Sequence, residues 1–316
     1  MDVKPYAAWS KCLHLSNGKV DVAATLEVGP RIIRCGWNGE RNLFKEFDGQ
    51  PTESGTDEWR CYGGHRLWHA PESMERTYVP DNGPVEWRES QGMASLVQPV
   101  EKKTGIQKQI DIWLHPTRPQ VRVVHRLRNL GVWDVEVAPW ALSVMAEEGR
   151  AIVPQEPYAP HPKALLPARP LVVWPYTNMT DKRISFGRHF VQLRQIPNMI
   201  GDPVKLGMRN TAGWCAYSLD GTVFLKRSRF LPSAVYPDFG CNTEVFTDSE
   251  MLELESLGPL QRLAAGGGEV AHEEHWFLFW AHLPAAEEEL ERALQPLLDR
   301  SRAWFEELCP PAAPTA

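Results

Sequence analysis

The sequence contains no long apolar run, and this absence argues against membrane-spanning and secreted classes of protein. No segment approaches the roughly 20 consecutive apolar residues that a transmembrane helix needs. The first twelve residues, MDVKPYAAWSKC, carry charges where a secretory signal requires an apolar stretch. We therefore expect a cytoplasmic protein with no membrane partner.

Cysteine is sparse and scattered, which excludes two further classes. The six cysteines form no CxxC motif, and their spacing matches neither a disulfide framework nor a zinc-binding pattern. We predict that they are reduced and mostly buried.

Clustered basic charge and nucleotide-binding motifs are also absent. The net charge is −6 with no basic block, which argues against a nucleic-acid partner. The sequence has no GxSxG motif, and its glycine run, AAGGGEV (264–270), precedes a strand-like segment instead of a helix, so it is not a phosphate loop. We expect no cofactor.

What the sequence does contain is alternation of apolar and polar residues with a period of two. Segments 19–28, 109–115, 120–129, 190–195 and 221–228 show this pattern, which is typical of antiparallel strands with one covered face. Segment 275–283, HWFLFWAHL, is apolar on both faces and predicts a strand buried on both sides. The fold class that we predict is all-β, a large antiparallel β-sandwich.

Only the C-terminal region has the period of a helix. Apolar residues recur at Leu290, Leu294, Leu297 and Trp304, with acidic residues in the first turns, so we expect one helix over about 284–308. Pro296 should kink or split it. Residues 310–316 read as a disordered tail, and residues 1–309 as a single domain.

The segment YGGHRLWHAPE (62–72) combines many residue types that carry chemistry. His65 and His69 are four residues apart, and a metal site is one reading, but no third ligand can be placed, so we predict no metal. Paired glycines let a backbone approach a ligand closely, so this segment instead suggests one wall of a binding site.

A second polar segment is MLELES (251–256), which places Glu253 and Glu255 on one face of a strand. Glu244 lies just upstream, and Arg66 and Lys226 could supply positive charge. Charged groups that form paired hydrogen bonds, together with 13 tryptophans as flat apolar surfaces, make up the composition of a sugar site.

Three long stretches, 15–47, 127–146 and 251–279, resemble galactose-mutarotase-like proteins (aldose 1-epimerase-like). Four shorter runs, GGHRLWHAPE (63–72), WPYTNMTD (174–181), YPDFGCNTE (236–244) and LELESLGP (252–259), resemble more closely an uncharacterised bacterial branch of that superfamily. The resemblance implies a β-sandwich whose concave sheet binds sugar. It also implies that Glu255, which matches the catalytic glutamate of an L-E-T-Q strand, is the general base.

The sequence departs from this family at the position of the general acid. The family histidine lies in a central strand, where this chain has APWALSV with Trp140. We take His65 as the candidate acid, with His69 and His189 as further candidates. Arg66 falls near the family's sugar-binding N-R pair.

The substrate-binding residues that we predict are Arg66, His69, Trp174, Tyr176, Lys226 and Glu244. The expected partner is a small-molecule carbohydrate, and the leading function is an isomerase acting at the anomeric carbon. Two alternatives stay open: a non-catalytic sugar-binding module, or a sugar lyase or hydrolase that uses paired carboxylates.

Overall fold

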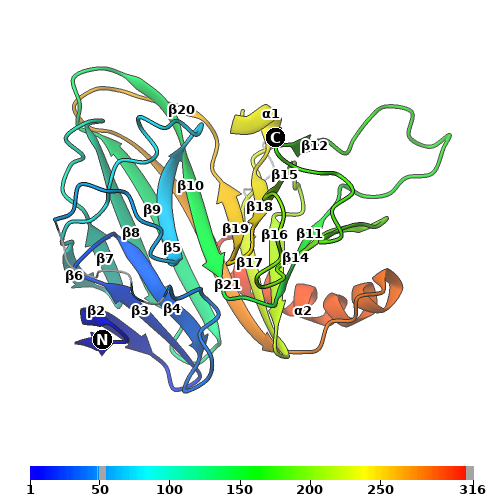
Figure 1. Cartoon of the computed structure of the whole chain (residues 1–316), viewed down its shortest axis with the longest axis horizontal. Helices are drawn as coiled ribbons and strands as arrows, with labels where there is room; N and C mark the ends of the chain where they lie inside the picture. Colours follow the sequence, from blue (N-terminus) through cyan, green and yellow to red (C-terminus); the bar gives the residue numbers. More distant parts are fainter. Residues whose placement is uncertain (48, 50–54, 311–316) are drawn as a thin grey trace.

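The structure is a computed structural model that describes residues 1–47, 49 and 55–310. These residues form two antiparallel β-sheets that pack face to face, with one long helix beside them (Figure 1). The alternating segments of the sequence become its strands, which confirms the predicted all-β sandwich. Among the described residues, no helix has the length and apolar character to cross a membrane.

The first sheet, called sheet A, has the order β1-β2-β3-β4-β5-β10-β19-β18-β15-β12, with β20 paired to β10. Its strands are β1 (Asp2–Tyr6), β2 (Trp9–Ser16), β3 (Val20–Thr25), β4 (Arg31–Trp37), β5 (Gly64–Ala70), β10 (Val135–Met145), β12 (Leu171–Val173), β15 (Val204–Met208), β18 (Thr243–Thr247), β19 (Leu252–Leu257) and β20 (Gln261–Leu263).

The second sheet, called sheet B, has the order β13-β14-β11-β16-β17-β21-β9-β8-β7-β6. Its strands are β6 (Glu86–Ser90), β7 (Met93–Val97), β8 (Ile106–Leu114), β9 (Gln120–Asn129), β11 (Arg150–Pro154), β13 (Ile184–Phe186), β14 (Phe190–Arg194), β16 (Trp214–Leu219), β17 (Thr222–Ser228) and β21 (Gly268–Trp280).

Side-chain alternation gives sheet A two different faces. On β5, β15 and β19, Leu67, Leu206 and Leu254 join the large core between the sheets. The neighbouring Trp68 and Trp140 belong to a separate apolar cluster on the outer face. Successive residues of a strand point to opposite faces, so this parity decides which polar residues can share one site.

The C-terminal helix, α2 (Glu287–Leu308), covers the outer face of sheet B. Leu290 and Leu294 are fully buried there, and the partly buried Trp304 packs against the same cluster, as predicted. Phe277 and Phe279 of β21 point toward this helix, which explains why that strand is apolar on both faces.

Pro296 was expected to kink or split the helix; it does not split it, because α2 is one continuous helix, and the kink stays a prediction. Pro296 and Arg292, whose carbonyl loses its intrahelical partner, both lie on the exposed side. Water can therefore satisfy that carbonyl, while the opposite side stays packed on sheet B.

A second, single-turn helix, α1 (Pro237–Gly240), precedes β18. Of the expected tail 310–316, residues 311–316 lie outside the described residues. The single domain over residues 1–309 stays a prediction.

Candidate functional site

A cluster of charged side chains lies on the outer face of sheet A, at its centre. Glu253 and Glu255 come from β19 and Glu244 from the neighbouring β18, where it pairs directly with Glu255. Lys205 of β15 and Arg66 of β5 bring the positive charges. We call these five residues the carboxylate cluster.

Lys205 joins two of the carboxylates. Its Nζ lies 3.0 Å from Glu244 Oε2 and 3.1 Å from Glu255 Oε2. Trp140 Nε1 donates a 2.6 Å hydrogen bond to the same Glu255 oxygen, and the Lys205 ammonium lies 4.4 Å from the centre of the Trp140 ring. The carboxylates raise the pKa of Lys205 well above its ordinary value despite its burial, so this lysine stays charged.

Arg66 holds the third carboxylate. Its Nη2 donates to Glu253 Oε1 at 2.8 Å, and its guanidinium lies 4.3 Å from the ring centre of Trp68 and 5.6 Å from that of Trp59. Tyr78 packs against both tryptophans, with ring centres 5.1 Å from each. Charged and flat aromatic groups therefore alternate along this face.

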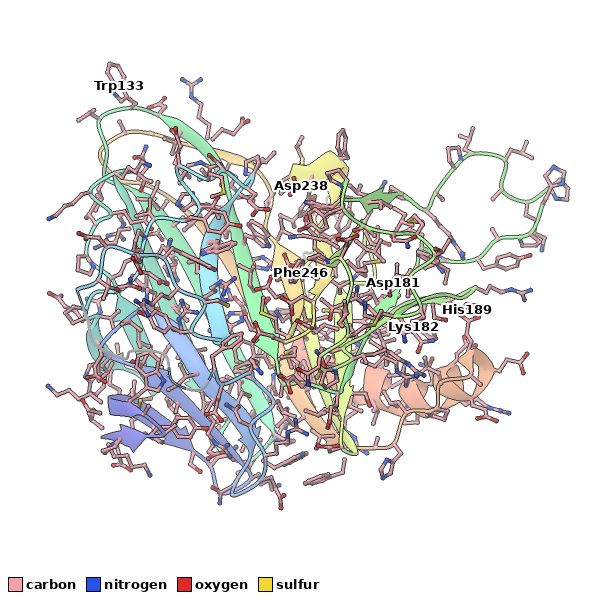
Figure 2. The ribbon with its side chains drawn as sticks, viewed as in Figure 1. Trp133, Asp181, Lys182, His189, Asp238 and Phe246 are labelled. Atoms are coloured by element: carbon pink, nitrogen blue, oxygen red, sulfur yellow. The ribbon has the colours of Figure 1, made fainter. Side chains whose placement is uncertain are left out.

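Burial raises the pKa of several acidic side chains at this site. It raises the pKa of Glu253 to about 7, and the nearby Glu255 adds to the rise while Arg66 opposes it. Burial also raises the pKa of Glu244 well above its ordinary value, and it raises the pKa of Asp238 on α1. Figure 2 marks Asp238 together with Phe246, which pairs with Glu253 across β18 and β19. Near neutral pH Glu253 is therefore partly protonated.

The segment after β12 lies over β15 beside the cluster. Thr177 exchanges hydrogen bonds with the backbone of Lys205, donating to its carbonyl at 2.9 Å and accepting from its N–H at 2.8 Å. The Trp174 ring centre lies 4.9 Å from Lys205 Nζ, and the ring packs on Gly207, where a Cβ atom would lie 3.1 Å from it. Tyr176 is 41% exposed, and burial of its hydroxyl raises its pKa to about 12.

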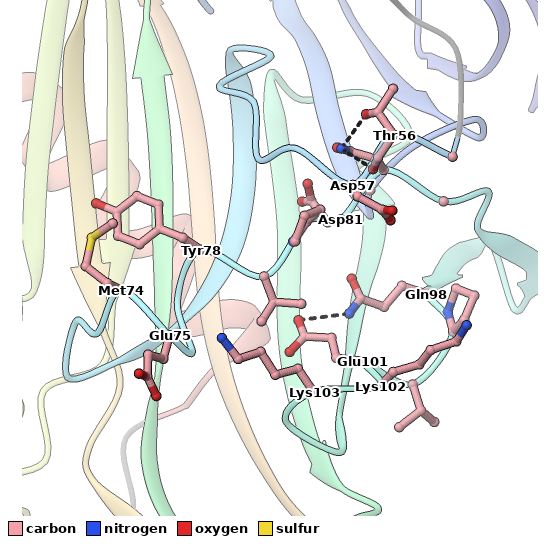
Figure 3. A pocket seen from close by; sticks show the side chains of 18 residues that line it. Thr56, Asp57, Met74, Glu75, Tyr78, Asp81, Gln98, Glu101, Lys102 and Lys103 are labelled. Carbon is pink, nitrogen blue, oxygen red and sulfur yellow. Dashed lines mark hydrogen bonds between the residues drawn. The ribbon is translucent and has the colours of Figure 1, made fainter.

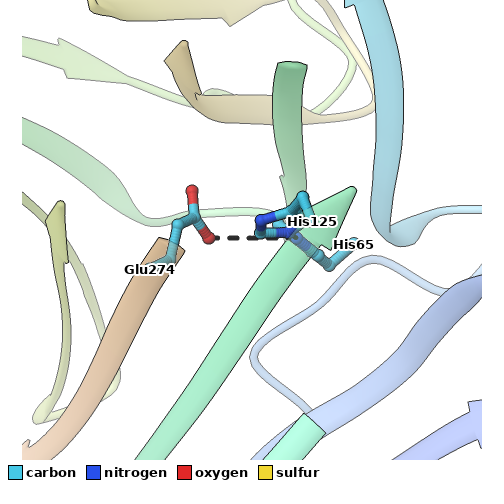
Figure 4. Close-up of side chains that lie close together, drawn as sticks. All are labelled: His65, His125 and Glu274. Carbon is cyan, nitrogen blue, oxygen red and sulfur yellow. Dashed lines mark hydrogen bonds and ion pairs between the residues drawn. The ribbon is translucent and has the colours of Figure 1, made fainter. Parts of the chain in front are cut away.

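His65 lies on the opposite face of β5, fully buried between the sheets (Figure 4). Its Nε2 is 2.6 Å from His125 Nε2 and its Nδ1 is 2.8 Å from Ser143 Oγ. Because His125 Nδ1 must donate to the His272 carbonyl, a neutral His125 accepts from His65, and Ser143 then donates to His65. Burial lowers the pKa of both His65 and His125, in agreement with neutral rings.

Glu274 is the anion of this interior network. It accepts from Trp276 Nε1 at 2.7 Å and from Ser256, and Lys226 Nζ lies 2.9 Å from its Oε1. The ligand atoms of His65, His125 and Glu274 lie within 4.8 Å of one another, as a metal site would require. The Lys226 ammonium already pairs with Glu274, so the positive charge of this lysine would repel a metal ion bound to these three residues.

His69 also lies on the inner side, away from the carboxylate cluster. Arg76 Nη1 donates to its Nδ1 at 2.8 Å, so its Nε2 carries the proton and faces Glu101 at 3.5 Å. Burial lowers its pKa.

The predicted site residues therefore separate into two groups. Arg66, Glu244, Glu255, Trp174 and Tyr176 come together at the carboxylate cluster. The expectation that His65, His69 and Lys226 line the same site does not fit their positions, because strand parity and packing place all three between the sheets. They are bound to protein partners and fully shielded from solvent.

Lys205 is the residue of the cluster that sequence reasoning missed. It stands in DPVKLGMRN, a short apolar segment in which a lysine flanked by buried Val204 and Leu206 was the available signal. The role of Trp140 as a donor to Glu255 also needed the structure, because 115 residues separate the two.

Comparison with solved structures identifies the architecture. The chain matches a proposed aldose 1-epimerase from Klebsiella pneumoniae subsp. pneumoniae with a TM-score of 0.58 and 11% identity, over 92% of this chain and 83% of that one. It matches a galactose mutarotase-like protein from Lactobacillus casei with a TM-score of 0.51 and 10% identity, over 85% and 100% of the chains. This chain has the galactose mutarotase-like fold.

A proposed aldose 1-epimerase from Escherichia coli K12 shares the galactose mutarotase-like fold too, with a TM-score of 0.53 and 12% identity, over 85% of this chain and 99% of that one. Neither a family model nor a curated protein matches the sequence. At these identities the likeness concerns the fold, so the chemistry must be argued from the site itself.

Proposed function

We propose that this protein binds an aldose over the carboxylate cluster and interconverts its anomers. The observation that carries the proposal is a pair of carboxyl groups, Glu253 and Glu255, on one face of one strand but in different surroundings. Glu255 is paired with Lys205 and Trp140, whereas the pKa of Glu253 is raised to about 7. Two carboxyl groups in such different environments can divide the roles of base and acid.

In the proposed reaction, Glu255 is the general base. Its Oε2 is bound by Lys205 and Trp140, while its Oε1 accepts no hydrogen bond from any residue that the structure describes. That free oxygen takes the proton from the O1 hydroxyl of the sugar. The matching position in the resembled family is its catalytic glutamate, which agrees with this role.

Glu253 is the proposed general acid, in place of the histidine that this chain lacks. With a pKa of about 7 it is protonated in a large fraction of molecules at neutral pH and gives its proton to the ring oxygen. The bond between C1 and the ring oxygen breaks as the C1=O1 carbonyl forms. Rotation about C1–C2 and the reverse proton transfers then close the ring as the other anomer.

The sugar-binding role of the surrounding groups follows from their chemistry. Arg66 and Lys205 donate to sugar oxygens, and Trp174 and Tyr176 offer flat surfaces to its C–H bonds. A ligand that binds here displaces part of the present ion pairing, because the carboxylates are nearly fully buried in the absence of sugar.

The test is the rate at which freshly dissolved α-glucose and α-galactose reach anomeric equilibrium, followed by polarimetry or NMR exchange. Glu255→Gln should lower the enzymatic rate by at least about a hundredfold, the lower range for loss of one general base, and leave sugar binding nearly unchanged. Glu253→Gln should have a comparable effect. Glu250→Gln, the same change at an exposed residue of the same segment, is the matched control.

A second candidate function is a non-catalytic sugar-binding protein. Trp140 favours it, because this residue stands where the resembled enzymes have their acid and it occupies Glu255 with a 2.6 Å hydrogen bond. Sugar binding without any acceleration of anomer exchange by the unmodified protein would reject the epimerase and leave this candidate.

A further inference from the structure

A cavity of about 420 Å³ opens beside the carboxylate cluster, on loops that the proposed chemistry does not use (Figure 3). Residues 55–57, 74–75, 78–83 and 98–103 contribute most of its lining. This volume lies in the range of sites that hold small molecules, roughly 300–1,000 Å³.

Two buried amide oxygens in the lining need hydrogen-bond donors. Asn82 Oδ1 and Gln98 Oε1 belong to residues that are each only 4% exposed, and neither oxygen accepts a hydrogen bond from the described part of the chain. Buried acceptors without a partner are rare in folded proteins, because leaving one unsatisfied has a free-energy cost.

The orientation of both amides is fixed by their other ends. Asn82 Nδ2 donates to Thr56 O and Oγ1 and to Glu58 O, at 3.0, 2.8 and 2.6 Å. Gln98 Nε2 donates to Glu101 Oε1 at 3.2 Å, and a carboxylate can only accept (Figure 3). The two oxygens therefore cannot be exchanged for nitrogens by turning the amide groups.

The rest of the lining supplies the other groups that a sugar requires. Lys102 and Lys103 are exposed donors, and the Tyr78 ring provides an apolar face together with Pro80 and Pro99. Asp57 and Glu75 add further acceptors to the lining, which disfavours an anionic ligand. Hydroxyl groups that both donate and accept, on a ring with C–H faces, fit this combination.

The cavity is joined to the carboxylate cluster through aromatic contacts. Tyr78 lines the cavity and packs on Trp68, whose ring lies under the Arg66 guanidinium, and Arg66 holds Glu253. The carboxyl group of Glu72 accepts a 2.5 Å hydrogen bond from Tyr78 at this junction.

We propose that this cavity is a second saccharide subsite, and that the natural ligand is a neutral oligosaccharide with a free reducing end instead of a single sugar. One unit lies at the carboxylate cluster, as in the proposed function on which this inference rests, and the neighbouring unit donates hydroxyl hydrogen bonds to Asn82 and Gln98.

The experiment compares binding of glucose and galactose with that of the reducing disaccharides maltose, cellobiose and lactose, by calorimetric titration. The unmodified protein should bind at least one disaccharide about tenfold more tightly than the matching monosaccharide, as two added hydrogen bonds allow. Gly83→Trp should abolish this gain without changing the monosaccharide affinity, because a Cβ at Gly83 meets no atom within 4 Å and the new ring extends into the cavity.

Val132→Trp, at an 81% exposed position that does not line the cavity, is the matched control and should leave both affinities unchanged. If Gly83→Trp fails to fold, Lys103→Ala, which removes an exposed donor, should still reduce the gain. Equal affinities for monosaccharides and disaccharides, or a gain that persists in these variants, would overturn the subsite.

Failure of the subsite and failure of the proposed function give different results. If the protein accelerates anomer exchange of monosaccharides but binds no disaccharide more tightly, the subsite is rejected and the proposed function is kept. If disaccharides bind more tightly than monosaccharides and Gly83→Trp removes this difference, but no sugar shows faster anomer exchange, the epimerase is rejected and the subsite is kept.

Discussion

Replacing Lys205 with methionine separates the role of its charge from that of its stem. The side chain is 5% exposed, and its Nζ lies 3.0 Å from Glu244 and 3.1 Å from Glu255, each of which has a fully buried side chain. Methionine keeps most of the apolar contact with Trp140 and Trp174 but removes the ammonium group. The variant therefore leaves buried carboxylates without their shared cation.

The expected loss in the free energy of unfolding is about 3–5 kcal/mol at pH 8, the usual cost of removing one partner of a buried ion pair. That is a large part of the roughly 5–15 kcal/mol by which a protein is stable. The loss should be smaller at pH 5. Without the ammonium group, a carboxyl group of the cluster takes up a proton in the folded variant, so its pKa is higher in the folded than in the unfolded state. Protonation of this group therefore stabilises the folded variant at low pH, and this stabilisation is lost as pH rises.

The assay is denaturant unfolding at pH 5 and pH 8, followed by tryptophan fluorescence. Lys45→Met is the control, because the Lys45–Glu147 pair is partly exposed and should contribute at most about 1 kcal/mol. The double variant Lys205→Met with Glu255→Gln should recover part of the loss, since it removes the charge that the single variant leaves unpaired. An unchanged midpoint at pH 8 for Lys205→Met would refute the reasoning.

Three further predictions concern other parts of the structure. The maximal rate of anomer exchange should fall as pH rises through about 7, the pKa of Glu253, and Glu253→Gln should lack this fall. Because the pKa of Glu253 is raised in the folded protein, the free energy of unfolding of the wild type should decrease by at most about 3 kcal/mol between pH 4.5 and 7, as measured by denaturant unfolding across that range. Gly207→Ala should destabilise the protein by about 1–3 kcal/mol and displace Trp174, because its Cβ would lie 2.7 Å from Cys241 Sγ; an unchanged melting temperature would contradict the packing. Glu274→Gln should lower the free energy of unfolding by about 3–5 kcal/mol, because it leaves Lys226 buried without its anion. The sugar affinity of the folded molecules should not change; weaker sugar binding would mean that the interior network belongs to the sugar site.

The strands and their faces could be predicted because they depend on local pattern. Alternation at 120–129 and 252–257 indicates one covered face whatever the neighbouring strand is. The same parity places Glu253 and Glu255 together, since their separation of two residues fixes a shared face in any strand. The C-terminal helix followed in the same way from the spacing of Leu290 and Leu294.

The position of the histidines could not be predicted, because parity gives two faces without saying which one is outside. His65 and Arg66 are adjacent, so the one lies between the sheets and the other on the outer face of sheet A. Both faces of the central strand β5 are buried, and hydrophobic alternation therefore gave no sign of which residue faces the site.

Which charges meet was likewise decided only by long-range packing. The sequence supplies carboxylates, a lysine and tryptophans, but pairing of Glu255 with Glu244, Lys205 and Trp140 depends on the order of β10, β19, β18 and β15 in sheet A. That order requires strands far apart in the chain to become neighbours, a choice made by the burial of the whole core. Local residue pattern thus determined the strands, the helix and the shared face of the two glutamates, while the tertiary structure alone decided their ion partners, their protonation and the cavity beside them.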